Sequence, residues 1–259
     1  MLLCPDNRIR QYRKKMARIE QVNDKNLRKA VIIKHYPEAA KEYSLLCSFD
    51  SPRIIKPIEL TDEGIIFPLY PQRAADGIAG YCSEREAWRF IRDVSEGLAY
   101  LHGKGLTHQD IKPSNILIDE SGYIISDFDM GTDHTSYAFT PPEWDKSRKK
   151  MTALSDIWSL GASVFTLVNG SYLFSGRGGS VQKESTPIPS LSEKFSKELR
   201  NIVQSCLSFD PSHRPSAEYL HDLAAKMAEI PAHKSPKSQR KHNDQQTVHE
   251  DIWPESMSI

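Results

Sequence analysis

A long amphipathic helix is the clearest element that the pattern of apolar and polar positions predicts. The segment Ser83-Glu84-Arg85-Glu86 is a capping box, in which the serine and the third-following glutamate satisfy each other's free amide groups. Gly103 and Gly105 are expected to end the helix. Its apolar residues recur at helical spacing and so share one face that can pack on a core: Ile91, Val94, Leu98 and Leu101.

Shorter apolar runs before this helix predict strands. Residues 8–34 are expected to contain the first strands, and the runs Ile54–Leu60 and Ile65–Leu69 to form two more. Between them, Pro37 occupies the first-turn position that proline favours, and it predicts a helix over the following residues EAAKEYSLL. One more short strand is expected over Thr107–Asp110, after the long helix.

Composition narrows the class of protein without suggesting a charged partner. The chain has 259 residues, enough for a sizeable core, and its 34 basic residues balance its 34 acidic ones. No nucleic-acid partner is therefore expected. The start has too short an apolar run for a signal peptide, and no segment is apolar enough to span a bilayer. Four cysteines without paired spacing fit a reducing compartment, so a soluble, cytoplasmic protein is expected: Cys4, Cys47, Cys82 and Cys206.

The end of the chain differs in composition from the rest. After Met227 the sequence becomes polar and proline-punctuated, and residues 230–259 are expected to form a disordered tail. Ile252-Trp253-Pro254 is either a docking segment or a stray apolar stretch within that tail.

The stretch His108–Asp129 carries the candidate chemistry. Within it Asp110 and Asn115 have the spacing of the catalytic loop of protein kinases, and Asp127 follows a short apolar strand where the Asp-Phe-Gly motif of that family belongs. The chain therefore resembles a eukaryotic-type Ser/Thr protein kinase, a compact and divergent one. The alternative reading of the stretch itself is a polar hairpin with a chance Asp and Asn.

The resemblance implies a role for each polar residue of this stretch. Asp110 would orient the acceptor hydroxyl and take its proton, while Lys112 would offset the charge of the transferring phosphoryl group. Asn115 and Asp127 would be the oxygen ligands of Mg²⁺, with ATP as the second cofactor.

The resemblance also implies the fold and the nucleotide pocket. It predicts an α+β, two-lobed kinase-like fold with a small β-rich lobe over residues 8–69 and a larger helical lobe over residues 70–229. Lys34, in the strand Val31-Ile32-Ile33-Lys34, would bind the phosphates. The carbonyl of Pro68 and the amide of Tyr70 would bind the purine, and Leu117 would line its pocket.

The resemblance implies that Lys34 pairs with a glutamate from the following helix. Glu38 and Glu42 lie one turn apart and so share a face. Glu42 fits better because Leu46 follows it at the spacing expected of a core leucine; the alternative is a surface glutamate.

The chain departs from the kinase-family pattern at two places that bear on nucleotide binding. The turn expected over Tyr12–Ala17 contains no glycine, and Ile32 replaces a small alanine. Lys14 and Lys15 could hold the phosphates by charge, nucleotide binding could be weak, or the lysines could belong to a solvated strand edge. A third departure, Asp129 in place of the motif's glycine, tolerates unusual backbone conformations better than most residues do.

The segment after Asp127 is short for an activation segment and ends at Thr140-Pro141-Pro142-Glu143. The resemblance implies that Arg214 pairs with Glu143 and that Asp156 anchors the catalytic-loop backbone. It also implies that the Ser136 hydroxyl hydrogen-bonds the catalytic Asp110 and Lys112. Gln109 precedes the catalytic Asp110 where many kinases have an arginine that binds phosphate, so activity independent of phosphorylation is expected.

The predicted function is ATP-dependent transfer of a phosphoryl group to serine or threonine hydroxyls of a protein substrate. The alternative is a pseudokinase that binds or scaffolds without turnover, supported by Ile32, Asp129 and the missing glycine turn. A small-molecule kinase is disfavoured by the Pro-Pro-Glu segment, which in protein kinases helps to form the peptide-binding surface. The sequence names neither the substrate nor the oligomeric state.

Overall fold

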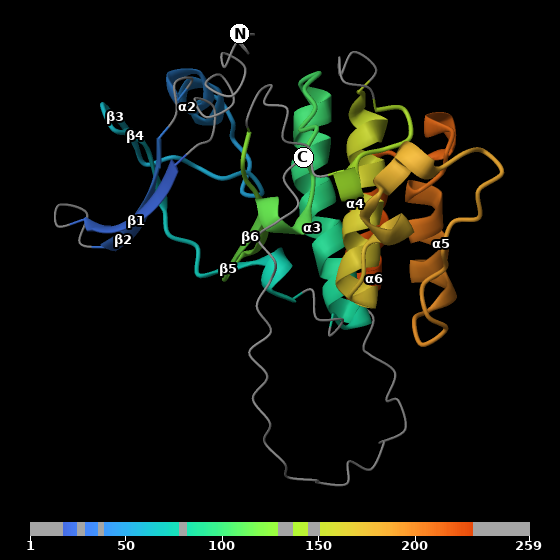
Figure 1. The fold of residues 1–259 in the computed structure, drawn as a ribbon. Helices are drawn as coiled ribbons and strands as arrows, with labels where there is room; N and C mark the ends of the chain where they lie inside the picture. Colours follow the sequence, from blue (N-terminus) through green and yellow to red (C-terminus); the bar gives the residue numbers. More distant parts are fainter. Residues whose placement is uncertain are drawn as a thin grey trace, which may run out of the picture.

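The computed structural model describes most of the chain between residues 18 and 229 (Figure 1). The described ranges are 18–24, 29–35, 39–77, 82–128, 137–144 and 151–229. The predicted tail over 230–259 lies outside them.

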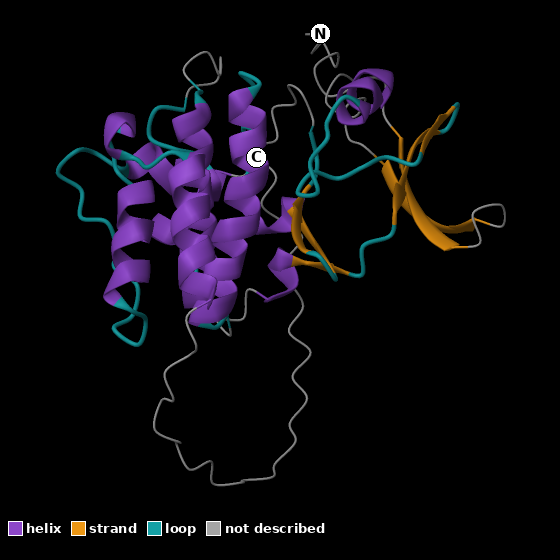
Figure 2. Ribbon diagram, turned by 180° about the vertical axis from the view of Figure 1, so that it is seen from behind, coloured by secondary structure: helices purple, strands orange, loops and turns teal. Residues whose placement is uncertain are grey.

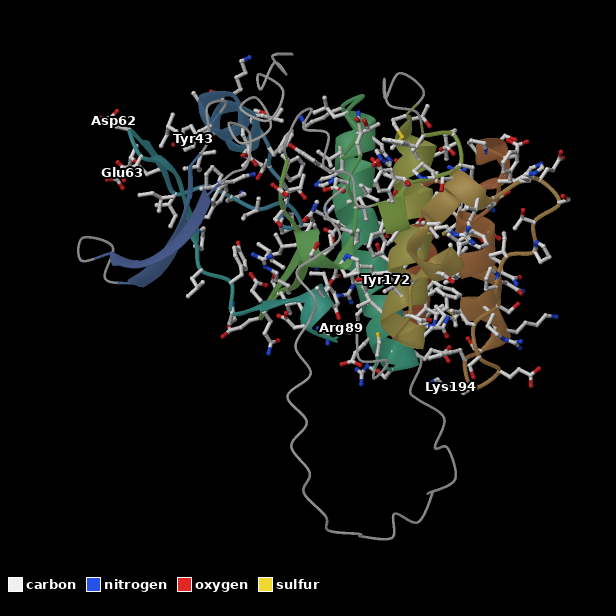
Figure 3. All side chains as sticks on the ribbon, in the orientation of Figure 1. Tyr43, Asp62, Glu63, Arg89, Tyr172 and Lys194 are labelled. Carbon is white, nitrogen blue, oxygen red and sulfur yellow. The ribbon has the colours of Figure 1, made fainter. Side chains whose placement is uncertain are left out.

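A strand-rich part forms one side of the molecule. It consists of β1 (Arg18–Asp24), β2 (Lys29–His35), β3 (Glu59–Thr61), β4 (Gly64–Pro68) and the helix α2 (Ala39–Cys47). The four strands form an antiparallel sheet in the order β1-β2-β4-β3, and α2 packs against β4. Figure 3 shows Asp62 and Glu63 at the tip of the β3–β4 hairpin, on the side of the molecule away from the larger helical part.

A larger helical part forms the other side. Its long helix α3 (Glu84–Gly103) packs against α4 (Ala153–Asn169) and α6 (Ala217–Glu229), and α5 (Lys197–Cys206) packs against α4. The short 3-10 helices are η1 (Ala74–Gly77), η2 (Pro113–Asn115), η3 (Tyr137–Phe139), η4 (Leu173–Gly176), η5 (Gly178–Val181) and η6 (Pro211–His213). This division confirms the predicted α+β fold with a small strand-rich part and a larger helical part.

A second small sheet lies between these two parts (Figure 2). It has the order β5-β6-β7, with β5 (Gln72–Arg73), β6 (Ile116–Asp119) and β7 (Gly122–Ile125) all antiparallel. Because β7 packs against α3, the segments that precede β6 and follow β7 are positioned relative to the helical part.

The helix α3 forms as its sequence predicts. The capping box is present: the Ser83 hydroxyl accepts the Glu86 N–H, and the Glu86 carboxylate accepts the Ser83 N–H. The helix ends at Gly103. Its predicted apolar face is buried in full: Ile91, Val94, Leu98 and Leu101 are each at most 3% exposed. None of the helices in the described ranges is both long enough and apolar enough to cross a membrane.

Two predicted strands are wrong. Over Ile54–Leu60 only Glu59 and Leu60 join a strand, because Ile54 and Ile55 turn instead toward Ile125 of β7, where Ile54 forms an isolated bridge. The Thr107–Asp110 segment forms no strand, because Gln109 has a left-handed backbone, with φ of 67°, that a strand cannot contain.

A largely buried ion pair joins two distant segments of the helical part. The Arg214 guanidinium binds the two carboxylate oxygens of Glu143 at 2.7 and 2.8 Å, which confirms the pairing expected from the sequence. The Ser155 hydroxyl donates to the same carboxylate at 2.7 Å. Burial raises the pKa of Glu143, but Arg214 and Ser155 outweigh burial, so the pKa lies below its usual value.

We expect Arg214→Ala to lower the free energy of unfolding by about 3–5 kcal/mol, because it leaves the Glu143 charge half-buried without its partner. Urea denaturation followed by tryptophan fluorescence measures this change. Arg177→Ala, at an exposed position, is the control and is expected to change stability by less than about 0.5 kcal/mol. A loss no larger in Arg214→Ala than in the control would contradict the prediction.

The same ion pair predicts a pH dependence. Because the folded pKa of Glu143 lies below the ordinary 4.5, its stabilising contribution is complete above pH 4.5 and is lost as pH falls through the folded pKa. Glu143→Gln should therefore cost about 1.5–3 kcal/mol at neutral pH. The difference from the wild type should shrink below pH 4.5. Paired urea titrations across this range measure it, and a difference independent of pH would refute the assignment.

Candidate active site

Three charged side chains from separate elements meet between the two parts of the molecule. The Lys34 ammonium lies 2.6 Å from Asp127 Oδ1 and 3.1 Å from Glu42 Oε2. Lys34 comes from β2, Glu42 from α2, and Asp127 from the segment just after β7. The pairing of Lys34 with Glu42 confirms the choice made from the leucine spacing; Glu38 lies outside the described residues.

The local structure explains why these groups converge. Lys34 pairs with Ile65 of β4 in the sheet, and Glu42 lies with Ala39 and Leu46 on the buried face of α2. Glu42 Oε1 also accepts the N–H of Phe128 at 3.2 Å, so one carboxylate contacts both the lysine and the Asp127–Phe128 backbone.

The opposite charges of Lys34 and Asp127 shift the pKa of each of these two groups. Burial lowers the pKa of Lys34, but the carboxylates of Asp127 and Glu42 outweigh that effect and raise it. Burial raises the pKa of Asp127, but the adjacent Lys34 outweighs it and lowers the value. The cluster therefore holds an ammonium between two carboxylates.

The catalytic loop brings together Asp110, Lys112 and Asn115. Asp110 Oδ2 accepts hydrogen bonds from Lys112 Nζ at 2.8 Å and from Asn115 Nδ2 at 2.9 Å. Asn115 Nδ2 also donates to the Asp110 carbonyl at 3.0 Å. Burial raises the pKa of Asp110 above its usual value, although Lys112 and Asn115 partly offset it. This makes the carboxylate a stronger base than an exposed aspartate.

A buried aspartate on α4 positions the residues just before Asp110. Asp156, on α4, accepts the N–H of His108 at 2.9 Å and the N–H of Gln109 at 2.7 Å. The ring of His102, on α3, also lies 2.9 Å from the Asp156 carboxylate. These contacts confirm the anchoring role expected of Asp156, and they hold Gln109 in its left-handed conformation.

His108 joins the catalytic loop to the segment of Asp127. Its Nδ1 accepts the Asp110 N–H at 3.2 Å, so its other nitrogen carries the proton and donates to the Ser126 carbonyl at 3.0 Å. The His108 ring also packs edge-on against Phe128, with centroids 4.8 Å apart. The His108 imidazole therefore fixes the backbone of Asp110 relative to the backbone just before Asp127.

A cleft of about 370 Å³ opens beside these groups. It contains every expected nucleotide-binding residue: Lys34, Glu42, Pro68, Tyr70, Leu117 and Asp127. Asn115 also lines it, and Phe67 and Ile55 add apolar wall. Such a concave site with apolar walls and a few convergent polar groups is typical of a small-molecule pocket.

Sequence reasoning missed several lining residues, among them Ile55, Arg73 and Ser114. Ile55 was expected in a strand, and Ser114 lies inside the recognised loop, so its position alone could have indicated it. Arg73 belongs to no recognised motif, and its pairing with Leu117 places it on the wall of the cleft. Tyr12–Ala17, Asp129 and Ser136 lie outside the described residues, and the side chain of Ile32 is not described either.

Known proteins resemble this chain along most of its length. The pattern that defines the protein kinase domain matches residues 10–224. Serine/threonine-protein kinase pim-2 of Danio rerio is 32% identical over 152 residues, covering 54% of this chain and 48% of that protein. Serine/threonine-protein kinase ppk11 of Schizosaccharomyces pombe is 34% identical over 159 residues, covering 55% of this chain and 51% of that protein.

A plant relative is similar over a stretch of comparable length. Mitogen-activated protein kinase kinase kinase 3 of Arabidopsis thaliana is 31% identical over 156 residues, which is 54% of this chain and 26% of that protein. The matched regions thus span about half or less of these relatives. Because the kinase-domain pattern covers residues 10–224, the chain belongs to the eukaryotic-type protein kinase family.

Proposed function

We propose that this protein is a serine/threonine kinase that transfers the γ-phosphoryl group of ATP to hydroxyl groups of a protein substrate. The observation that carries the proposal is the convergence of Lys34, Asp110, Asn115 and Asp127 in and beside one cleft, each oriented by a specific partner. Pseudokinases that have degenerated usually lose one of these four polar residues.

The cleft is suited to an adenine nucleotide. Phe67, Ile55 and Leu117 offer apolar surface for the purine, and the carbonyl of Pro68 and the amide of Tyr70 are the expected hydrogen-bond partners on its edge. Proline lacks an N–H, but this position needs only its carbonyl. Lys34, held protonated by its two carboxylates, would bind the phosphates.

The donor set fits Mg²⁺. Asn115 Oδ1 and Asp127 Oδ2 accept no hydrogen bond from the described residues, because Asn115 is held through its Nδ2 and Asp127 through its Oδ1. Oxygen ligands of this kind, completed by phosphates and water, are what Mg²⁺ prefers. No cluster of three His, Cys, Asp or Glu occurs within the described ranges, so a dedicated all-protein metal cage is not part of the proposal. A bound Mg²⁺ would neutralise charge on the phosphates.

Asp110 provides the base. Its Oδ2 is occupied by Lys112 and Asn115, whereas its Oδ1 has no hydrogen-bond partner in the described part of the chain. Oδ1 would accept the proton of the acceptor hydroxyl as the hydroxyl oxygen bonds to the γ-phosphorus. The bond to the bridging oxygen breaks, and a nucleoside diphosphate leaves. Lys112 would offset charge on the phosphoryl group.

The proposed setting is the cytoplasm. The cysteines that the structure describes, Cys47, Cys82 and Cys206, are all free thiols, as a reducing compartment requires. The partner is a protein substrate, and balanced net charge supports neither nucleic acid nor a membrane surface as a second partner.

The first test is phosphoryl transfer. Purified protein with Mg²⁺ and radiolabelled ATP is expected to label a generic acceptor protein, and Asp110→Asn and Asp127→Asn are each expected to reduce the rate at least about 100-fold. Thermal denaturation with and without Mg²⁺-ATP reports binding separately.

Two results would overturn parts of this proposal. Wild type that neither transfers phosphate nor gains thermal stability from Mg²⁺-ATP would refute the kinase assignment. A thermal shift without transfer would indicate the pseudokinase, which the unusual residue Ile32 and the glycine-free turn favour. Lys183→Met, at an exposed position away from the cleft, is the control for nonspecific loss.

A further prediction concerns regulation by phosphorylation. Gln109 is uncharged, and its side chain donates to Thr107 Oγ1 at 2.9 Å, so it offers no guanidinium to a phosphorylated activation segment. We therefore expect the initial rate to be unchanged after phosphatase treatment, with removal of phosphate confirmed by mass spectrometry. A fall of about tenfold or more, equivalent to about 1.4 kcal/mol, would contradict this.

A further inference from the structure

Arg73 is a charged residue on the wall of the cleft whose guanidinium forms no ion pair or hydrogen bond with any described residue. It lies on β5, where it pairs with Leu117 of β6, and its backbone N–H donates to Asp76 Oδ2 at 2.8 Å. Its backbone is therefore fixed, while its side chain is exposed and lines the cleft.

The other charged groups at the cleft have partners. Lys34 is bound between Glu42 and Asp127, and Lys112 is bound to Asp110. Each of these two lysines lies within 3.1 Å of a carboxylate of the protein, whereas Arg73 is the one cation lining the cleft, within the described ranges, that has no carboxylate partner.

The nearest acidic residues in the sequence do not neutralise Arg73. Asp76 binds its backbone, and no ion pair joins the Asp76 carboxylate to the guanidinium. Asp119, at the end of β6, accepts the N–H and the hydroxyl of Ser121 within a tight turn. The Arg73 guanidinium is therefore available to an anion from outside the described chain.

The position of Arg73 indicates which molecule brings that anion. β5 and η1 both lie against η2, the short helix that ends the catalytic loop at Asn115. Arg73 also follows the Pro68–Tyr70 segment, the proposed binding site of the neutral purine, by only three residues. The anionic phosphates of a nucleotide would meet Lys34, and the Mg²⁺ that Asn115 and Asp127 would hold, at the Asp127 end of the cleft.

We propose that Arg73 is a specificity-determining residue that binds an acidic side chain of the acceptor protein, close to the serine or threonine that is modified. The proposal rests on the proposed function, which makes the acceptor a protein. A guanidinium matches a carboxylate with two parallel hydrogen bonds, which gives direction as well as charge. Because the site is exposed, the preference is several-fold and weakens with added salt.

The test compares capped peptides that share one central serine. Two Asp, two Ala or two Lys residues are placed either before or after the serine, and kcat/KM is measured for each. We expect the wild type to prefer an acidic peptide over its basic counterpart by about fivefold or more. Arg73→Gln should remove this ratio, and Arg73→Glu should reverse it.

A control of equal charge change keeps the test specific. Figure 3 shows Lys194 on the helical part, far from the strand-rich side of the molecule. Lys194→Glu changes the net charge by the same amount as Arg73→Glu, and it is expected to retain the acidic preference. Loss of the preference in both variants would overturn the proposal, because it would reflect overall charge.

Two further measurements separate this inference from the proposed kinase activity. Fluorescence anisotropy of labelled peptides, on wild type and on Asp127→Asn, reports the acidic preference without turnover. Binding that favours acidic peptides and depends on Arg73 supports the inference even where no phosphate is transferred. Equal binding of acidic and basic peptides, or an Arg73→Glu variant that changes only the KM for ATP, overturns it.

Discussion

The buried carboxylate of Asp156 is the constraint on which the candidate site depends. It accepts the N–H groups of His108 and Gln109, and it is fully buried. Gln109 has φ of 67°, a conformation that costs a residue with a side chain about 1–3 kcal/mol. Hydrogen bonds to a charged group are worth about 1.5–3 kcal/mol each, so the two together offset that cost. Asp110 follows directly, so its position depends on a carboxylate on α4.

The second organising feature is the charge cluster of Lys34, Glu42 and Asp127. Lys34 and Glu42 are buried charges that would be costly to bury alone, and each is stabilised by an opposite charge from a different element. Because β2 and α2 belong to the strand-rich part and Asp127 follows β7, the cluster also sets how the two parts approach each other. His108 extends this coupling, since its ring bonds both the Asp110 backbone and the Ser126 carbonyl.

The two proposals assign chemistry and recognition to different side chains of the same cleft. The groups proposed for transfer are held by partners within the protein, which keeps their geometry independent of the acceptor. Arg73 has a fixed backbone and no ion pair among the described residues, so its side chain is available to a partner molecule. Such a division allows substrate choice to change without disturbing Asp110 or Asp127.

The sequence by itself determined the elements whose signals are local and the pairs that recur at fixed motif positions. The capping box of α3, its apolar face, the pairing of Lys34 with Glu42 and the pairing of Arg214 with Glu143 were all predictable on those grounds. Tertiary structure alone decided the rest. Ile54 leaves the expected strand because Ile125 offers a buried partner, and Gln109 leaves it because Asp156 binds its N–H. Arg73 is held on the cleft wall by pairing with Leu117, a contact between distant residues that no local pattern encodes.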